Sequence, residues 1–342
     1  MPGTGTGSSG GKLTFSKLTQ FIRPGLALSN GTIYLASAAH CEDAGTPYHG
    51  WLFAYDAATL SQKAAFVTTP NGTSGGIWMS GAGIAVDQNG DVFVSTGNGT
   101  FDTGHIPAQA FGDSIVKLAG GNLNLLDYFT PYNQGALDGP DLDVGAGGVL
   151  LLPDQQGTYT HELVQAGKGG SIYLINRDQM ALQNLHYCIT NCSNTDPQIV
   201  QELGNAVGGM WAMPSYWNNS VYFWGQNDRL KAYGISNGML SASPTSSSTT
   251  SVADFGVTTS VSSNGTSNGI VWGITIQPTG PGAAVLHAYD ASNVANELYN
   301  SNQAPNNRDV PGLRVKFAVP IVANGRVYIG TQTELDVYGL LP

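Results

Sequence analysis

The stretch Ser220-Val-Tyr-Phe-Trp224, followed after four residues by Arg229-Leu-Lys-Ala-Tyr233, decides the fold of this 342-residue chain. Both segments are short and rich in β-branched and aromatic residues, which are typical of buried strands. The same pair of segments occurs six times along the sequence. The second segments contain, at intervals of 49 to 63 residues, Tyr55, Leu118, Ile175, Tyr233, Tyr289 and Tyr338. This recurrence predicts six copies of one structural unit.

Further strands surround each pair. Residues 84–86 and 320–322 precede two of the pairs, and residues 125–129 and 297–299 follow two of them. Four short strands in each unit, with no sustained helical period, are the signature of a propeller blade. The Asn-Gly pairs at residues 30–31, 89–90 and 324–325 favour tight turns before a strand. We therefore expect an all-β protein, a β-propeller of four-stranded antiparallel blades with six blades visible.

The sixth unit ends after its third strand, close to Pro342. We expect residues 12–18 to supply the missing strand and close a six-bladed ring, because an open ring would expose two sheet edges. The alternative is that the six units belong to a seven- or eight-bladed propeller. Residues 1–11 are expected to be a flexible segment, and residues 12–342 to form a single domain.

The charge of the chain excludes some partners. It has 13 basic and 23 acidic side chains, a net charge of −10 and an isoelectric point near 4.8. Binding to a phosphate backbone needs basic patches, so we expect no nucleic-acid partner. No apolar run is long enough to span a membrane, so we expect no membrane insertion. A monomer is the expected state.

The cysteines indicate the compartment. Cys188 and Cys192 are close enough in sequence to form a small disulfide loop, the alternative being two free thiols, and Cys41 is left over. Disulfides persist in oxidising compartments. Residues 1–11 have neither the basic nor the apolar region of a signal peptide. We expect a secreted or periplasmic protein whose export signal is absent from this sequence.

Three phrases point to a known family. Residues 53–59 (Phe-Ala-Tyr-Asp-Ala-Ala-Thr), 286–293 (Leu-His-Ala-Tyr-Asp-Ala-Ser-Asn) and 327–331 (Val-Tyr-Ile-Gly-Thr) resemble repeats of the pyrroloquinoline-quinone (PQQ) dehydrogenase-like, or quinoprotein alcohol dehydrogenase-like, propellers. The family repeat continues through Thr-Gly to a Trp that docks on the next blade, and this half is missing after Asp56 and Asp290. The adjacent Cys-Cys pair of many cofactor-using members is also missing. The resemblance implies the fold and, more distantly, a PQQ and Ca²⁺ site.

The funnel at the centre of such a propeller is where this family binds ligands. Its walls are the segments that enter each inner strand and the loops that join the second and third strands. Gly-x-Ile/Met-Trp occurs twice at entry positions, and aromatic faces there can stack on a flat cofactor or a sugar. The alternative is packing between blades. The resemblance places a basic residue near the quinone, a role that Lys168 could fill. The candidates for this wall are Arg23, Trp78, Lys168, Trp211, Arg314, Lys316 and Phe317.

Three polar loops carry the other candidates. The loop 39–51 offers metal ligands or an acid–base pair, the loop 96–105 offers oxygen and imidazole ligands, and the loop 137–144 offers a calcium cluster. The alternative for each is a polar loop that bonds its own backbone. The candidates, in the order of the loops, are His40, Glu42, Asp43 and His49, then Asn98, Asp102 and His105, then Asp138, Asp141 and Asp143.

These candidates support three functions. The first is a propeller whose polar, aromatic-lined funnel binds a carbohydrate-like or other small polar ligand. The second is a PQQ- and Ca²⁺-dependent oxidoreductase acting on alcohols or sugars, with Asp102 or Asp143 as the base. The third is a metal-assisted hydrolase or lyase that uses His40, His49 and the Asp cluster. The residues alone leave the choice, and the cofactor, open.

Overall fold

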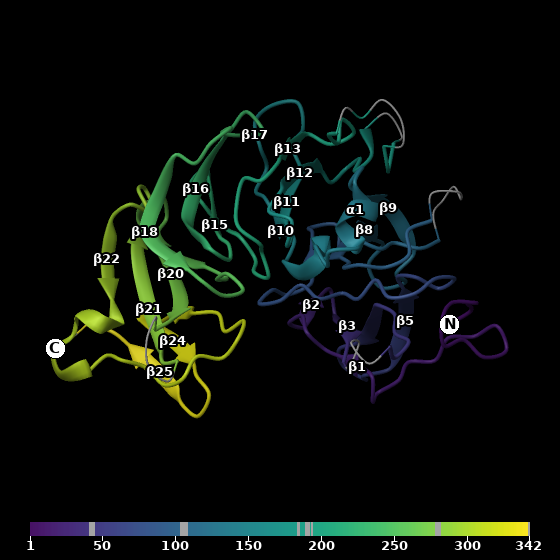
Figure 1. Cartoon of the computed structure of the whole chain (residues 1–342), viewed down its shortest axis with the longest axis horizontal. Helices are drawn as coiled ribbons and strands as arrows, with labels where there is room; N and C mark the ends of the chain where they lie inside the picture. The colour runs from purple at the N-terminus through teal and green to yellow at the C-terminus, as the bar shows by residue number, and fades with distance from the viewer. Residues whose placement is uncertain are drawn as a thin grey trace.

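The structure is a computed structural model that describes residues 1–40, 45–102, 109–182, 185–188, 192, 194–277 and 282–340. These residues form six antiparallel sheets, which stand side by side as the blades of a fan in Figure 1. The expected all-β propeller with six blades is confirmed. In the described part of the chain the one α-helix is α1 (Gln134–Asp138), and it is accompanied by 3-10 turns at Val144–Ala146, Ser301–Gln303 and Pro305–Asn307.

Within each sheet the strands pair largely with their neighbours in chain order. The first three sheets contain β1 (Gln20–Phe21), β2 (Ala27–Ser29), β3 (Thr32–Ala39), β4 (Trp51–Asp56) and β5 (Gln62–Val67); β6 (Ala85–Val86), β7 (Val92–Ser95), β8 (Ile115–Leu118) and β9 (Leu125–Phe129); and β10 (Leu150–Leu151), β11 (Glu162–Ala166), β12 (Ile172–Asn176) and β13 (Gln201–Leu203). The last three contain β14 (Ser215–Trp217), β15 (Ser220–Trp224), β16 (Asp228–Ser236), β17 (Met239–Leu240) and β18 (Ser246–Val252); β19 (Ser260–Asn264), β20 (Ser267–Ile276), β21 (Ala284–Asp290) and β22 (Glu297–Asn300); and β23 (Ile321–Ala323), β24 (Arg326–Gly330) and β25 (Leu335–Tyr338).

Apolar packing between neighbouring sheets holds the blades in place. Phe93 on β7 and Tyr173 on β12 belong to one buried cluster, which joins the first three sheets. Trp224 on β15 and Tyr289 on β21 belong to another, which joins the fourth sheet to the fifth. Strands β7, β11 and β12 are buried along their whole lengths. Strands covered on both faces lose the alternation of exposed and buried residues, which is why their sequences read as continuous apolar runs.

The packing stops between the sixth sheet and the first. Among the described residues no buried apolar cluster joins these two sheets. Leu28 on β2 is 71% exposed and Ile321 on β23 is 63% exposed. The two sheets meet at the centre, where the Arg23 guanidinium carbon lies 5.0 Å from the centre of the Phe317 ring. The tightly closed ring that we expected is therefore not formed by these six blades, and we call this place the seam.

The N-terminal segment also departs from expectation. Residues 12–18 do not extend the sixth sheet, whose described strands are β23, β24 and β25. Leu13 instead packs with Trp51 on the first sheet, and the Phe15 ring lies 5.2 Å from the Phe53 ring. The first sheet thereby covers the apolar side chains of Leu13 and Phe15. Residues 1–11 are held too, because Gly5 N donates to the carbonyl of Pro70 at 2.9 Å.

Two local predictions are confirmed. Asn30 and Gly31 have φ angles of 48° and 68°, and Asn324 and Gly325 have φ angles of 51° and 72°, as the tight turn before a strand requires. Cys188 and Cys192 form a disulfide. Cys41 lies outside the described residues. No helix within the described ranges is long and apolar enough to cross a membrane.

A buried tyrosine tests the packing between the fourth and fifth sheets. Tyr222 is fully buried, and its hydroxyl donates a 2.6 Å hydrogen bond to the carbonyl of Ala291. Tyr222→Phe leaves that buried carbonyl without its donor, so we expect a loss of about 1–3 kcal/mol in the free energy of unfolding, measured in urea. Tyr216→Phe is the control, because the Tyr216 hydroxyl bonds only within its own exposed hairpin in the described structure. Equal losses in both variants would contradict the prediction.

Candidate functional site

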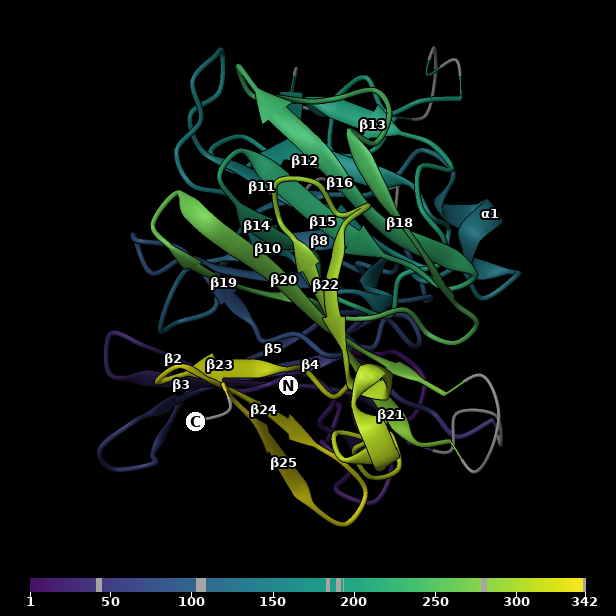
Figure 2. The ribbon, with the colours of Figure 1, turned by 90° about the vertical axis from the view of Figure 1, so that its left-hand side faces the viewer.

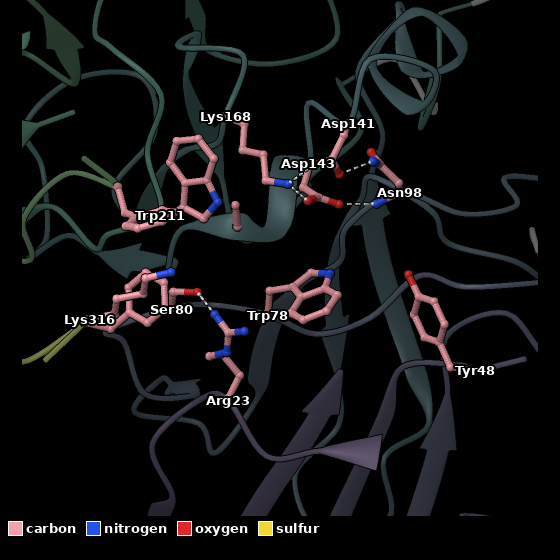
Figure 3. A pocket seen from close by; sticks show the side chains of 13 residues that line it. Arg23, Tyr48, Trp78, Ser80, Asn98, Asp141, Asp143, Lys168, Trp211 and Lys316 are labelled. Atoms are coloured by element: carbon pink, nitrogen blue, oxygen red, sulfur yellow. Dashed lines mark hydrogen bonds and ion pairs between the residues drawn. The ribbon is translucent and has the colours of Figure 1, made fainter. Parts of the chain in front are cut away.

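The segments that lead into the first strand of each blade converge at the centre of the propeller. Trp78 precedes β6, Trp211 precedes β14, Phe255 precedes β19, and Lys316 and Phe317 precede β23. Arg23 precedes β2, and Asp143 and Ala146 lie before β10. Loops between second and third strands add Tyr48, Asn98 and Lys168. Together they enclose a cavity of about 240 Å³, the central pocket, whose lining is Arg23, Tyr48, Trp78, Ser80, Asn98, Asp141, Asp143, Ala146, Lys168, Trp211, Phe255, Lys316 and Phe317 (Figure 3).

A buried ion pair forms one wall of the central pocket. The Lys168 Nζ lies 2.5 Å from Asp143 Oδ2 and 2.8 Å from Asp141 Oδ2. The side chains of Lys168 and Asp143 are 11% and 7% exposed, whereas Asp141 is largely exposed. Figure 3 shows the ammonium between the two carboxylates. Such a pair is held only if the remaining oxygens of the buried carboxylate are also hydrogen-bonded.

The loop 96–99 supplies those hydrogen bonds. The backbone N–H of Asn98 donates to Asp143 Oδ1 at 2.6 Å, and Asn98 Nδ2 donates to Asp141 Oδ1 at 2.9 Å. Gly97 makes this approach possible, because a Cβ there would stand 2.2 Å from Asp143 Oδ1 and 2.7 Å from the Trp78 ring. The glycine at this position therefore allows the close backbone approach that the sequence indicated.

Burial and charge act in opposite directions on this pair. Burial raises the pKa of Asp143, and the Lys168 ammonium opposes that rise. Burial alone would lower the pKa of Lys168, but the carboxylates of Asp143 and Asp141 raise it. Lys168 therefore keeps its proton, and its positive charge pairs with the carboxylates of Asp141 and Asp143.

A second buried acid lies behind the wall. Asp113 is fully buried; its Oδ1 accepts from Val144 N at 3.1 Å, and its Oδ2 lies 3.3 Å from Gln134 Nε2. Burial, together with the charge of Asp143, raises the pKa of Asp113 to about 8. Elsewhere burial raises the pKa of Glu162 and of Asp196 to about 7. The fold therefore holds several carboxyl groups that resist ionisation near neutral pH.

Aromatic rings and cations form the opposite side of the pocket. The Arg23 guanidinium carbon lies 5.3 Å from the centre of the Trp78 ring, and its Nη1 donates to Ser80 Oγ at 3.2 Å. The Lys168 Nζ lies 5.5 Å from the Trp211 ring. Phe317 has a φ of 65°, a conformation that bulky residues rarely adopt. Strain of this kind persists where the surroundings fix it, and it is common at ligand sites.

Most of the predicted funnel wall is present in the central pocket. The residues named from the sequence that line it are Arg23, Trp78, Asn98, Asp141, Asp143, Lys168, Trp211, Lys316 and Phe317. Sequence reasoning missed Tyr48, Ser80, Ala146 and Phe255. Phe255 precedes the first strand of a blade, as Trp78 and Trp211 do, so the position within the repeat could have found it. The position of Tyr48 within its repeat does not mark it as a pocket residue.

The histidine candidates have other roles or other places. His49 is buried, its Nδ1 lying 2.8 Å from Thr69 Oγ1 and its Nε2 2.9 Å from the carbonyl of Thr6. Burial lowers the pKa of His49. Both ring nitrogens therefore have hydrogen-bond partners, and the contact of Nε2 holds the N-terminal segment. His49 does not line the central pocket. His40 is exposed and does not line the central pocket; its ring lies 6.1 Å from that of Phe21.

Three more candidates lie away from the pocket. Asp102 does not line it, and its backbone N–H donates to the carbonyl of Ala110. Asp138 ends α1 as an exposed residue. Arg314 pairs with Asp254 and donates to the carbonyl of Gly256, so its charge is neutralised outside the pocket lining. The remaining candidates Glu42, Asp43 and His105 fall outside the described residues.

The residues of the expected calcium cluster do not fit a calcium ion. The position between the carboxylates of Asp141 and Asp143 is taken by the Lys168 ammonium, and Asp138 does not line the central pocket. Calcium needs six to eight oxygen ligands, and a lysine within bonding distance of two of them repels the ion. Within the described ranges no group of three or more His, Cys, Asp or Glu side chains could hold a metal.

Comparisons with known proteins give the fold. No protein-family model matches the sequence, and no curated protein matches it. The structure is similar to the quinohemoprotein alcohol dehydrogenase of Comamonas testosteroni (TM-score 0.53, 15% identity, 89% of this chain and 55% of that one) and to quinohemoprotein alcohol dehydrogenase ADHIIG of Pseudomonas putida HK5 (0.52, 14%, 89% and 54%). It is also similar to the computationally designed Ika8 protein (0.52, 11%, 93% and 71%). The chain spans about half the length of the two dehydrogenase chains.

The ion pair can be tested by stability. Lys168→Met leaves the buried Asp143 carboxylate without its cation, so we expect a loss of about 3–5 kcal/mol in the free energy of unfolding at pH 7. Adding Asp143→Asn to that variant removes the uncompensated charge, and we expect most of the loss to be recovered. Urea unfolding of the single and double variants measures both values. A double variant as unstable as Lys168→Met alone would contradict the assignment.

The buried Asp113 predicts how stability depends on pH. The unfolded group ionises near its ordinary pKa of 3.8, whereas the folded group keeps its proton to about pH 8. Between these values unfolding releases a proton, so stability falls as the pH rises, by about 1.4 kcal/mol per pH unit from this group alone. Asp113→Asn mimics the protonated acid and should reduce the fall in Tm between pH 5 and pH 8. An identical fall in wild type and variant would refute the burial effect.

Proposed function

We propose that this protein, which has the fold of the quinoprotein alcohol dehydrogenase propellers, binds a small polar ligand of carbohydrate type in the central pocket. The observation that carries the proposal is the convergence of all six blade-entry segments on one cavity that combines aromatic faces with polar side chains. A volume of about 240 Å³ is below the roughly 300–1,000 Å³ of pockets for drug-sized molecules, and it suits a single ring.

The two tryptophans support a sugar as the ligand. Trp78 and Trp211 border the same cavity in Figure 3, and Tyr48 stands 6.5 Å from the Trp78 ring. Flat aromatic faces give contact area to the C–H face of a sugar at little cost in conformational entropy. Arg23, Asn98 and the exposed Asp141 present hydrogen-bonding groups around those faces, which can orient hydroxyl groups.

A PQQ-dependent oxidoreductase is the second candidate. Two of the solved structures with this fold are quinohemoprotein alcohol dehydrogenases. In the central pocket, tryptophan faces and the cations of Arg23 and Lys316 suit a flat anionic quinone, and the group would supply hydride acceptance when bound. The calcium that accompanies PQQ has no place beside Asp143 while Lys168 occupies it. The candidate therefore ranks below a simple binder.

The remaining properties of the proposal follow from the chain as a whole. The disulfide between Cys188 and Cys192 suits an oxidising compartment, and we place the protein outside the cytoplasm, secreted or periplasmic. The net charge of −10 disfavours a nucleic-acid partner. We propose a monomer that acts on a small ligand.

Thermal unfolding with a panel of ligands tests the proposal. The arms are a set of mono- and disaccharides, Ca²⁺, a chelator, PQQ alone and PQQ with Ca²⁺. A saccharide present at a hundred times its Kd stabilises the folded state by about 2.7 kcal/mol and raises the Tm. We expect at least one saccharide to do so, no effect of the chelator, and an affinity at least about 10-fold weaker in Trp78→Ala, measured by calorimetry.

Trp217→Ala is the matched control. Trp217 is half-buried on β14 outside the pocket lining, and its indole donates to the carbonyl of Gly265. Its replacement should lower stability and leave the saccharide affinity unchanged. A panel without any saccharide effect, together with a rise in Tm from PQQ and Ca²⁺ beyond that from Ca²⁺, would replace the binding proposal with the oxidoreductase.

A further inference from the structure

A cavity of about 1060 Å³ opens between the fifth and sixth sheets. Ile270 and Trp272 on β20 line one wall, and Val327 on β24 with Asp336 and Tyr338 on β25 line the other. None of its lining residues belongs to the central pocket. We call this cavity the crevice. It is a separate place on the molecule, and the proposed function does not use it.

The sixth sheet has no strand outside β25 in the described part of the chain. There β25 pairs only with β24, whereas β21, the third strand of the fifth sheet, pairs with both β20 and β22. Figure 2 shows β25 at the outer edge of the yellow sheet. Leu335 on this strand is 65% exposed. An edge strand of this kind presents unpaired N–H and C=O groups that another strand can meet.

The fifth sheet shows what fills the corresponding space one blade earlier. Between the fourth and fifth sheets, the turn that follows β21 inserts Ala291 and Val294, which are 2% and 0% exposed, into the buried cluster around Trp224. The turn then leads into β22, the fourth strand. Among the described residues no such turn and no fourth strand follow β25. The crevice is therefore the place of a turn and a strand that these residues do not supply.

One side chain in the crevice indicates the charge of a matching strand. Residues 286–289 (Leu-His-Ala-Tyr) and 335–338 (Leu-Asp-Val-Tyr) are corresponding parts of third strands, so Asp336 stands where His287 does. The Nδ1 of His287 lies 2.6 Å from Oε1 of Glu297 on β22. The Oδ2 of Asp336 is buried and has no hydrogen-bond partner among the described residues. A basic residue in the place of Glu297 would give this costly acceptor its partner.

We propose that the crevice and the edge of β25 bind an extended segment of a partner protein, which adds to the sixth sheet as its fourth strand. Main-chain hydrogen bonds to β25 hold such a segment, and alternate side chains select it. It carries a small aliphatic residue in the place of Val294 and, three positions later, a basic residue that pairs with Asp336. The inference goes beyond the proposed function and does not depend on it.

Charge argues for a partner protein over a second copy of this chain. The chain has a net charge of −10, so two copies repel each other, whereas a basic segment is attracted. The segment of this chain that we expected to supply a strand, residues 12–18, is already used, because Leu13 packs with Trp51 on the first sheet.

A pair of 11-residue peptides tests the proposal by calorimetry with the 342-residue chain. One has the sequence of residues 290–300 with Glu297→Lys, and the other has the unchanged sequence, which sets a glutamate against Asp336. We expect the lysine peptide to bind at least about 10-fold more tightly, because an opposite-charge contact replaces a like-charge contact. The lysine peptide with N-methylated amides at positions 297–300 has lost its backbone donors, and it should not bind.

Variants of the chain locate the charge contact. Asp336→Asn should abolish the preference for the lysine peptide, and Asp336→Lys should reverse it in favour of the glutamate peptide. Asp154→Asn is the matched control, because it makes the same change of charge at a side chain that is 64% exposed and outside the crevice lining. It should leave the preference unchanged.

Hydrogen exchange locates the bound peptide. The amides of β25 that face away from β24 should exchange rapidly in the chain alone and at least about 10-fold more slowly with the lysine peptide bound. Equal affinities of the two peptides, no binding at millimolar concentration, or protection of a strand other than β25 overturns the proposal, and the central pocket is unaffected by that result.

The chain alone distinguishes the other occupants. If β25 already exchanges slowly and the chain sediments as a dimer, the occupant is a second copy. If β25 exchanges slowly in a monomer, a segment of the chain itself fills the crevice. Either result overturns the assignment to a partner protein.

Discussion

The inner strands of this chain are apolar on both faces, so the sheets are stabilised by packing face to face on their neighbours. This constraint arranges the blades around a centre, because a row of twisted sheets that pack face to face curves into a fan. The buried apolar clusters that join successive sheets are the contacts that produce this arrangement. At the two ends of the row no second sheet covers the outer strands within the described residues, and Leu28 and Ile321 are exposed. The seam exists because the packing stops there.

The centre of the propeller is lined by polar and aromatic side chains rather than by packed sheet faces, because only short segments and loops reach it. Each blade narrows toward its first strand, so no sheet face is available to fill the middle, and the entry segments bring single side chains instead. Their polar groups must then be paired with one another. The wall of Lys168, Asp141 and Asp143 does this by placing one ammonium between two carboxylates. The other side of the pocket is formed by the rings of Trp78, Trp211, Phe255 and Phe317, which gives the site its mixed character.

The sequence predicted the blades well because the information for them is local. Strand pairs, turns at Asn-Gly and the position of each entry segment are set within a few residues, and Trp78 and Trp211 could be placed in the funnel from their positions in the repeat. Contacts between residues far apart in the chain were harder to predict from the sequence. Nothing near Lys168 shows that it sits between two carboxylates rather than facing a quinone, and nothing near His49 shows that the N-terminal residue Thr6 covers it. Residues 12–18 have the composition of a strand, but the decision between the edge of β25 and the face around Trp51 depends on burial, which the sequence does not display.

The position of Lys168 bears on chemistry as well as on structure. A cation between two carboxylates reduces the negative charge that would attract a divalent metal, and the carboxylate of Asp143 accepts a hydrogen bond from the backbone N–H of Asn98. A carboxylate engaged in this way is a poor general base, because its lone pairs are already committed and protonation would break a buried pair. The same geometry makes a good recognition wall, since its groups are fixed before any ligand arrives and pay no reorganisation on binding. The arrangement of charges is the physical basis of the proposal that this site holds a polar molecule.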